Sequence, residues 1–438
     1  MSSAARWRSG RSSVDTLVAR RLGLGPDFLR ADLEAAQLRL LRETVAWAKE
    51  RSPWYRESLV GIDPASLTDL EELSRLPLLT SAQIASSGHL MLCVSQREVA
   101  RIITLQTSGS TGRPKRIHFT PEDLDSTAQF FLHGMLSLLD VGWKVLVLLP
   151  TAVPDSTGDL LMRVLPEHGI SAVAQWPPLP WTEQAKSVRR YGIDCVIGLP
   201  QHQLALGEHL RSGDLQTMLL CSDYSPGPLR KRIEAACGCE TFVHYGTTES
   251  GLGGGVECFA HNGCHLRDSD LLVEILDPET GSVLPGGQTG EVVLTTIGRK
   301  GMPLLRYRTG DMGWLDRSTC VCGGVSSRLG GLSGRMIHHR LPGGKCLSSQ
   351  ELDDTLFLIP GLLDYRATLC AGSRERLDIE FLSSESDRPT ALRVRQMLLT
   401  VPAIAAAVRT ELFEIGQLQG VSAFAPSHTV KRTIVDNR

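Results

Sequence analysis

The sequence has no long apolar run and no excess of charge of either sign, and both absences limit what the protein can be. None of its apolar segments approaches the roughly 20 consecutive residues that a membrane-spanning helix needs. Residues 1–13 are basic and rich in serine but lack the apolar core of a secretory signal, so we expect a cytoplasmic location. The net charge of -2 provides no global field for nucleic acid or an acidic membrane, and neither is expected as a partner.

The cysteines also lack the pattern of a disulfide framework. There are 11 of them, an odd number, scattered through 438 residues. We expect most to be reduced and buried, because cysteine packs like a small hydrophobic side chain. The length is sufficient for two or three domains, and an apolar fraction of 42% is ordinary for a globular protein.

Hydroxyls, glycines and cations are concentrated in one loop, Thr107-Ser-Gly-Ser-Thr-Gly-Arg-Pro-Lys115. The sequence predicts a strand on each side of it, over 101–106 and 117–120. Glycine lets the backbone approach a ligand closely, and hydroxyls, N–H groups and the cations of Arg113 and Lys115 suit anionic oxygens. A polyphosphate site is the favoured interpretation and an ordinary surface loop is the alternative; the spacing is not that of a Walker loop. The candidate contacts are Thr107, Ser108, Gly109, Ser110, Thr111, Gly112 and Lys115.

Beyond this loop, apolar runs alternate with segments of helical periodicity. Predicted buried strands cover 143–149, 195–199, 218–222 and 241–244, and predicted helices cover 123–139, 183–190, 201–211 and 228–236. This alternation favours a layered α/β domain, in which ligands lie at the carboxyl ends of the strands. From residue 271 the pattern changes to shorter strands, with an antiparallel pair predicted over 272–277 and 290–296.

Two polar turns in these regions carry groups that suit a nucleotide. Tyr245-Gly-Thr-Thr-Glu249 follows a predicted strand directly: the ring can stack on a purine, Thr248 can donate to a phosphate, and Glu249 can hold magnesium. In the predicted turn Thr309-Gly-Asp311, the carboxylate can bind two ribose hydroxyls. The alternative for both is a turn without chemistry, since threonine, glycine and aspartate are common turn formers.

Taken together, the three motifs resemble those of the adenylate-forming superfamily, which contains the acyl- and aryl-CoA synthetases. The helix predicted over 32–49 and the turn Pro53-Trp-Tyr-Arg56 are similar to the phenylacetate-CoA ligase branch. The resemblance implies an α/β protein: a large N-terminal domain, 1–333, of layered α/β sheets with a β subdomain, and a small mobile α+β C-terminal domain, 334–438. It also implies nucleotide contacts from Tyr245, Gly246, Thr247, Asp311 and Arg335.

The C-terminal motifs depart from the family pattern. In the family a Gly-Lys-x-x-Arg run supplies a lysine for adenylation, but aligning on Arg432 places Thr429 at the lysine position and His428 at the glycine position. Lys431 is two residues further along, and alternate side chains of a strand share one face. We therefore expect either that Lys431 takes over this role or that adenylation is weakened. The small domain is predicted to contain helices near 350–358 and 390–399 and a strand near 377–382.

Four further residues have the composition of a metal site. Cys258, His265, Cys320 and Cys322 would supply three thiolates and one imidazole, the ligand set of a structural zinc ion. Cys264 competes with His265 for the fourth position, and four buried thiols are the alternative to any metal. The resemblance to the phenylacetate-CoA ligase branch favours zinc.

The resemblance implies an ATP-dependent acid–thiol ligase that uses Mg²⁺ and coenzyme A on an aromatic acid, in aromatic acid metabolism or natural-product biosynthesis. Its catalytic residues would be Lys115, Thr248, Glu249 and Lys431, with Lys115 and Glu249 expected to be exposed at a cleft. The acid would contact residues from 132–137, 150–159 and 222–224. One alternative is an acyltransferase between coenzyme A and a carrier-protein phosphopantetheine, with adenylation lost; another is a non-catalytic nucleotide-binding protein.

Overall fold

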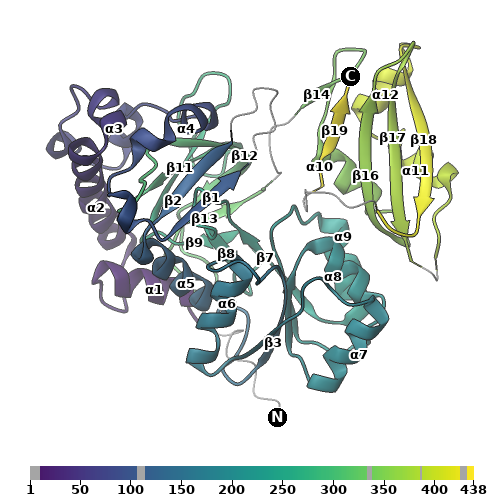
Figure 1. Cartoon of the computed structure of the whole chain (residues 1–438), viewed down its shortest axis with the longest axis horizontal. Helices are drawn as coiled ribbons and strands as arrows, with labels where there is room; N and C mark the ends of the chain where they lie inside the picture. The colour runs from purple at the N-terminus through teal and green to yellow at the C-terminus, as the bar shows by residue number, and fades with distance from the viewer. Residues whose placement is uncertain (1–9, 106–113, 333–337, 385–386, 425–431) are drawn as a thin grey trace. The chain divides into compact units, whose positions relative to one another are not determined.

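The structure is a computed structural model that describes residues 10–105, 114–332, 338–384, 387–424 and 432–438. It contains two compact units (Figure 1), and each is described by itself. The first comprises Met1–Ala174 and Phe242–Leu332, and the second comprises Gln175–Thr241 and Ser333–Arg438. The domain boundary expected between residues 333 and 334 stays a prediction.

The first unit contains an antiparallel hairpin that flanks the predicted phosphate loop. Strands β1 (Arg101–Leu105) and β2 (Lys115–Phe119) pair so that Leu105 lies opposite Lys115. Helix α5 (Pro121–Met135) follows at once, because Thr120 caps its first turn and Pro121 supplies a preset φ at the start. The remaining helices of this unit are α1 (Ser13–Leu22), α2 (Arg30–Arg51), α3 (Pro53–Ser58), α4 (Ser81–Ser87) and α6 (Thr157–Val164).

Seven neighbouring strands form a sheet in the first unit, in the order β10-β11-β12-β13-β9-β8-β7. Adjacent members pair antiparallel, including the predicted pair β10–β11. Two more strands, β3 (Lys144–Leu148) and β4 (Ser171–Ala174), pair in parallel. The seven are β7 (Glu240–Tyr245), β8 (Gly255–Glu257), β9 (Cys264–Leu266), β10 (Leu271–Leu276), β11 (Gly290–Thr296), β12 (Tyr307–Asp316) and β13 (Arg328–Gly330).

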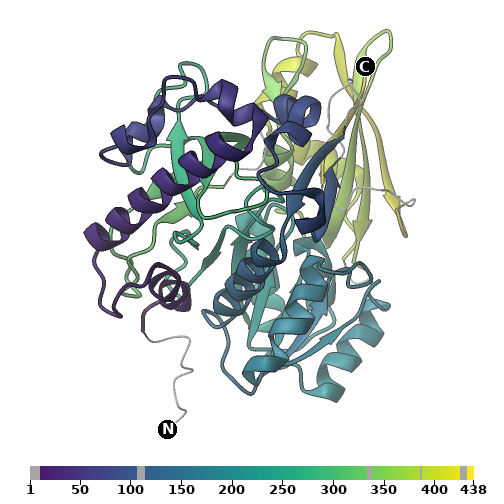
Figure 2. The same ribbon diagram turned by 60° about the vertical axis from the view of Figure 1, so that its left-hand side comes forward.

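The long helix α2, purple in Figure 2, packs against this sheet. Its buried side chains Leu41, Val45 and Ala48 belong to the same apolar cluster as Leu272 of β10 and Leu294 of β11. Burial of such side chains stabilises the fold by about 1.5–3 kcal/mol each. The N-terminal helices therefore fix the sheet that carries the nucleotide motifs.

The second unit has a parallel strand pair, β5 (Cys195–Gly198) with β6 (Thr217–Leu220), as the sequence predicts. It also has a four-stranded sheet in the order β18-β17-β16-β19, in which β16 and β17 pair antiparallel (Figure 1). These four strands are β16 (Leu362–Cys370), β17 (Glu375–Ser383), β18 (Phe413–Val421) and β19 (Ile434–Asn437). The remaining elements are α7 (Trp181–Tyr191), α8 (Pro200–Gly207), α9 (Gly227–Cys237), β14 (His339–Arg340), β15 (Cys346–Leu347), α10 (Ser349–Leu356), α11 (Ala391–Leu398) and α12 (Pro402–Val408).

The predicted α/β fold class is confirmed, with local differences: for example, the helix predicted over 201–211 ends at Gly207, and the strand predicted over 117–120 begins at Lys115. The helix predicted over 123–139 begins at Pro121 and ends at Met135. The turn predicted at Thr309-Gly-Asp311 is an irregularity inside β12: Arg308 pairs with Val293 and Met312 pairs with Glu291, so three residues bulge opposite Val292. Gly310 has φ +74°, a conformation that glycine adopts without steric cost.

Among the described residues, no single helix has the length and apolar composition needed to cross a membrane. One bent helix pair, α11 with α12, reaches the threshold by length and composition only, with an angle of 97° between its halves.

A buried charge cluster in the second unit is centred on Arg432. Its Nε donates to Asp353 at 2.8 Å, its Nη1 lies 3.3 Å from Asp223, and its Nη2 donates to the Tyr224 carbonyl at 2.7 Å. Burial raises the pKa of Asp353 to about 6, and the nearby Arg432 opposes that rise. The cluster joins Asp223 and Tyr224, which follow β6, to Asp353 of α10 and to Arg432 near the end of the chain.

Removal of Arg432 should destabilise the second unit. We expect Arg432→Met to cost about 3–5 kcal/mol, because it leaves Asp223 and Asp353 buried without their counter-charge. The loss should grow as pH rises, since without Arg432 the pKa of Asp353 rises further and the folded state holds a proton that the unfolded chain releases. Denaturant unfolding at several pH values measures this, with Arg39→Met, from an exposed pair with Glu43, as the control. Equal, small losses in both variants would contradict it.

Candidate functional site

Three side chains from distant parts of the chain meet in the first unit. Lys115 begins β2, Glu249 follows β7, and Tyr307 begins β12. The Lys115 ammonium forms an ion pair with Glu249 Oε1 and donates to Tyr307 Oη at 2.9 Å. Tyr307 Oη donates to the same Oε1 at 2.9 Å. One carboxylate oxygen is thus shared by an ammonium and a phenol.

The expectation that Lys115 and Glu249 are exposed is wrong. Lys115 is 5% exposed and Glu249 is 2% exposed. Burial raises the pKa of the Glu249 carboxyl, but Lys115, together with hydrogen bonds that include the one from Tyr307, lowers it below its usual value. The reason is mutual pairing: a buried cation and anion are retained only where each neutralises the other.

The turn that holds Glu249 is fixed by short-range hydrogen bonds. Thr247 Oγ1 accepts from the Ser250 N–H at 3.2 Å, and Ser250 Oγ accepts from the Thr247 N–H at 3.0 Å. The buried Arg299 donates to the Glu249 carbonyl at 2.9 Å. Thr248, the predicted phosphate contact, is half-buried in this turn.

Sequence reasoning did not assign Tyr307 or Arg299 to the site. Tyr307 lies two residues before the predicted Thr309-Gly-Asp311 turn, so its position next to a candidate motif is a local signal. Arg299 lies in the connection after β11 and carries no local signal, because only the fold brings it to the Glu249 carbonyl.

Tyr245 and Asp311 are brought together as a second pair. Tyr245 Oη donates to Asp311 Oδ2 at 3.0 Å. The bulge in β12 orients Asp311: its N–H donates to Thr309 Oγ1 at 3.0 Å, and that hydroxyl donates to the Val292 carbonyl at 2.7 Å. Burial raises the pKa of Tyr245 well above its usual value, and Asp311 adds to this. The phenol therefore stays protonated and holds the carboxylate by a charge-assisted hydrogen bond.

Several predicted site residues lie outside the described residues, and their placement stays a prediction. They are Thr107, Ser108, Gly109, Ser110, Thr111, Gly112, Arg335 and Lys431, together with the positions His428 and Thr429. The contacts proposed for the acid over 132–137, 150–159 and 222–224 also stay a prediction.

The four predicted metal ligands converge at one place. The ligand atoms of Cys258, His265, Cys320 and Cys322 all lie within 4.8 Å of one another, and all four residues are buried. Cys258 Sγ is 3.8 Å from Cys320 Sγ, and Cys322 Sγ is 3.5 Å from His265 Nε2. Strand β9 decides between the two candidates for the fourth position: Cys264 Sγ donates to the Val243 carbonyl at 3.5 Å, whereas the next residue, His265, enters the cluster.

Within the cluster, the surroundings of Cys322 favour its thiolate. A hydrogen bond from Cys258 lowers the pKa of Cys322 to about 3, against the effect of burial. The Gly324 N–H donates to Cys322 Sγ at 3.3 Å. On its other side His265 Nδ1 is 2.9 Å from Ser326 Oγ, and Ser326 donates to the buried Asp15. Such an outer hydrogen bond fixes the tautomer in which Nε2 faces a metal.

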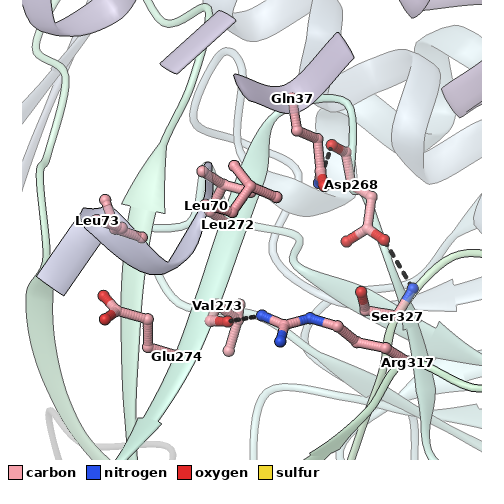
Figure 3. A pocket seen from close by; sticks show the side chains of 9 residues that line it. All are labelled: Gln37, Leu70, Leu73, Asp268, Leu272, Val273, Glu274, Arg317 and Ser327. Atoms are coloured by element: carbon pink, nitrogen blue, oxygen red, sulfur yellow. Dashed lines mark hydrogen bonds between the residues drawn. The ribbon is translucent and has the colours of Figure 1, made fainter. Parts of the chain in front are cut away.

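A small cavity between α2 and β10 is not a site for an aromatic acid. Figure 3 shows Gln37, Asp268 and Arg317 among its lining residues. Its volume is about 30 Å³, which is room for water rather than for an aromatic ring. Gln37 Nε2 donates to the Asp268 carbonyl at 2.8 Å, and the Ser327 N–H donates to the Asp268 carboxylate at 2.7 Å. The first bond connects α2 to the segment between β9 and β10, and the second connects that segment to the residues just before β13.

Residues 69–298, more than half of the chain, match the AMP-binding enzyme family, and the chain belongs to this family. A phenylacetate-coenzyme A ligase of Thermus thermophilus is 29% identical over 356 residues, which cover 77% of this chain and 78% of that protein. The phenylacetate-coenzyme A ligase of Escherichia coli is 26% identical over 319 residues, covering 70% and 72%. The resemblance predicted from the sequence is confirmed.

The fold has close counterparts among solved structures. A 2-hydroxyisobutyryl-CoA ligase in its postadenylation state aligns over 94% of this chain and 91% of that chain, with a TM-score of 0.75 and 19% identity. At this identity the likeness establishes the shared fold.

The buried ion pair predicts a specific pattern of stability. We expect Glu249→Gln and Lys115→Met each to lose about 3–5 kcal/mol, since either leaves one buried charge uncompensated. The double variant should recover most of that loss, because no lone charge remains. Chemical denaturation of the native protein, the two single variants and the double variant completes a double-mutant cycle. Glu183→Gln and Lys186→Met form the matched control, because this pair is exposed. Simple additivity of the two buried replacements would show that the charges do not depend on each other.

Proposed function

We propose that the protein is an ATP-dependent ligase that joins an aryl or arylalkyl acid to coenzyme A through an acyl-adenylate. The observation that carries the proposal is the convergence of Lys115, Glu249 and Tyr307, with Tyr245 and Asp311 held as a second pair in the same unit. Family membership and the similarity to phenylacetate-coenzyme A ligases support it. The relatives also favour coenzyme A over a carrier protein as the thiol.

In the first half-reaction, a carboxylate oxygen of the acid attacks the α-phosphate of ATP and pyrophosphate leaves. In the second, the thiol attacks the carbonyl carbon of the acyl-adenylate and AMP leaves. The chain contributes positioning and charge. Asp311 accepts hydrogen bonds from the ribose hydroxyls, Thr248 donates to an α-phosphate oxygen, and the loop ending at Lys115 binds the β- and γ-phosphates. This is catalysis by alignment and electrostatic stabilisation.

The Lys115–Glu249 pair has to separate before both residues meet the nucleotide. Glu249 offers the carboxylate oxygens that a hard cation requires, so it is the residue that would hold Mg²⁺. When bound, Mg²⁺ would neutralise phosphate charge. Lys115 would then exchange the carboxylate for a phosphate, and Tyr307, in contact with both groups, would keep each in place during the exchange.

The half-reactions can be measured separately, which tests the proposal. We expect ATP–pyrophosphate exchange that depends on phenylacetate or a related aromatic acid, followed by thioester formation with coenzyme A. Glu249→Gln should abolish most of the exchange. Thioester transfer from a supplied acyl-CoA without any exchange would instead support an acyltransferase, and the absence of both activities would support a non-catalytic nucleotide-binding protein.

The C-terminal lysine gives a sharper form of this test. We expect Lys431→Ala to lower ATP–pyrophosphate exchange by about 10²-fold or more, the usual scale for loss of one electrostatic stabiliser. Transfer from a supplied acyl-CoA should change little, because the charge on the leaving pyrophosphate is absent from that step. Thr429→Ala is the matched control and should retain exchange. Unchanged ATP–pyrophosphate exchange in Lys431→Ala would show that another cation stabilises the charge on the leaving pyrophosphate.

We also propose that Cys258, His265, Cys320 and Cys322 bind a structural zinc ion. Three soft sulfur ligands, one imidazole and a fully buried position fit the closed ligand set of such sites. When bound, the ion would link β9 to the segment around Cys320 and Cys322.

Purified protein should contain one zinc ion per chain, and Cys320→Ala with Cys322→Ala should remove it. Metal binding contributes folding free energy directly, so metal loss should lower the melting temperature. Cys264→Ala is the matched control, because its Sγ bonds to the Val243 carbonyl. Elemental analysis with thermal unfolding measures both effects; metal-free native protein of unchanged stability would refute the site.

A further inference from the structure

Two cysteines outside the zinc cluster lie in unusually close contact. Cys237 is the last residue of α9, and Cys239 precedes the first residue of β7. Their Sγ atoms are 3.1 Å apart. Cys237 is 0% exposed and Cys239 is 5% exposed. Neither thiol has a role in the ligase reaction.

The backbone between them fixes this arrangement. Gly238 has φ +65°, which ends the helix, and a Cβ there would lie 2.5 Å from Ser212 Oγ. Only glycine therefore fits the link between the two thiols. The Gly238 N–H also donates to the Glu234 carbonyl at 2.9 Å, which completes the helix cap.

Side-chain bonds hold both sides of the tripeptide. The Cys237 thiol contacts the Ile233 carbonyl at 3.0 Å. On the strand side, Glu234 accepts from Thr241 Oγ1 at 2.6 Å, and Arg230 donates to the Thr241 carbonyl at 2.8 Å. The two sulfur atoms are thus held together by the fold rather than meeting by chance motion of a loop.

We propose that Cys237 and Cys239 form a dithiol site that hydrogen peroxide oxidises to an intramolecular disulfide. The Cys237 thiolate attacks one peroxide oxygen, the O–O bond breaks, and the sulfur becomes a sulfenic acid as the first water leaves. Cys239 then attacks that sulfur, the S–S bond forms, and the second water leaves. Two electrons and two protons pass from the thiols to the peroxide, so the step balances.

The electrostatics give the two thiols different parts in this sequence. The hydrogen bond from Cys239 lowers the pKa of Cys237, and the same contact raises the pKa of Cys239. This direction favours Cys237 as the attacking thiolate and Cys239 as the resolving thiol. Both cysteines are buried, so a small neutral oxidant is favoured over a bulky one such as glutathione disulfide.

Other cysteines of the same unit provide internal comparisons. Cys195 is buried, and burial raises the pKa of its thiol to about 12. Cys346 is exposed on the short strand β15. If solvent exposure decided which cysteine is oxidised, Cys346 would react first. If the closeness of a second thiol decides it, Cys237 and Cys239 form a disulfide.

Proteolysis can isolate the site. Cleavage after Glu234 and Glu240 releases residues 235–240, a peptide that contains Cys237 and Cys239 and no other cysteine. The native full-length protein is treated with hydrogen peroxide, quenched in acid, alkylated and digested. We expect the peptide to appear two hydrogens lighter and without alkyl groups, and to regain two alkylation sites after dithiothreitol.

The controls distinguish proximity from general oxidation. Cys195→Ser should leave the disulfide unchanged, whereas Cys237→Ser and Cys239→Ser should abolish it. Glutathione disulfide should modify Cys346 before it affects the pair. If both thiols of the native protein remain alkylatable after Cys346 is fully oxidised, or if the bond forms only in denaturant, the proposal is wrong. Because the readout is covalent, it is independent of ligase activity.

Discussion

The buried pairing of Lys115 with Glu249 is the interaction on which the candidate site depends. An uncompensated charge in the interior would cost several kcal/mol, so β2, the turn after β7 and the start of β12 have to meet with both charges in register. Tyr307 bonds to both partners and adds a geometric requirement to the electrostatic one. The pairing also leaves the two buried side chains with no net charge between them.

Other buried polar contacts lie elsewhere in the first unit. Asp15 of α1 bonds to Ser326, which contacts His265 of the Cys₃His cluster. Gln37 of α2 bonds to the Asp268 carbonyl close to β10. Arg299 bonds to the Glu249 carbonyl. These contacts tie α1 to the sulfur cluster, α2 to the residues just before β10, and the segment after β11 to the Glu249 turn.

Much of the site was predictable because its motifs are local. The Tyr245–Glu249 and Thr309–Asp311 segments carry their candidate groups within a few residues; the first follows a strand as predicted, whereas the second lies in a bulge inside β12. The burial of Lys115 and Glu249 could not be predicted from the sequence. A charged residue next to a glycine-rich loop is ordinarily solvated, and the partner of Lys115 lies 134 positions away. Arg299 was missed for the same reason.

By itself the sequence determined the α/β class, the order of the strands that precede the motifs, and the residue types available for nucleotide and metal binding. Periodicity and turn chemistry are properties of neighbouring residues, so they can be read without a fold. The tertiary structure decided which side chains meet: His265 rather than Cys264 joins the cysteines, Asp311 projects from a bulge rather than a turn, and Cys237 contacts Cys239. These outcomes depend on pairing register and burial, which distant segments impose on each other.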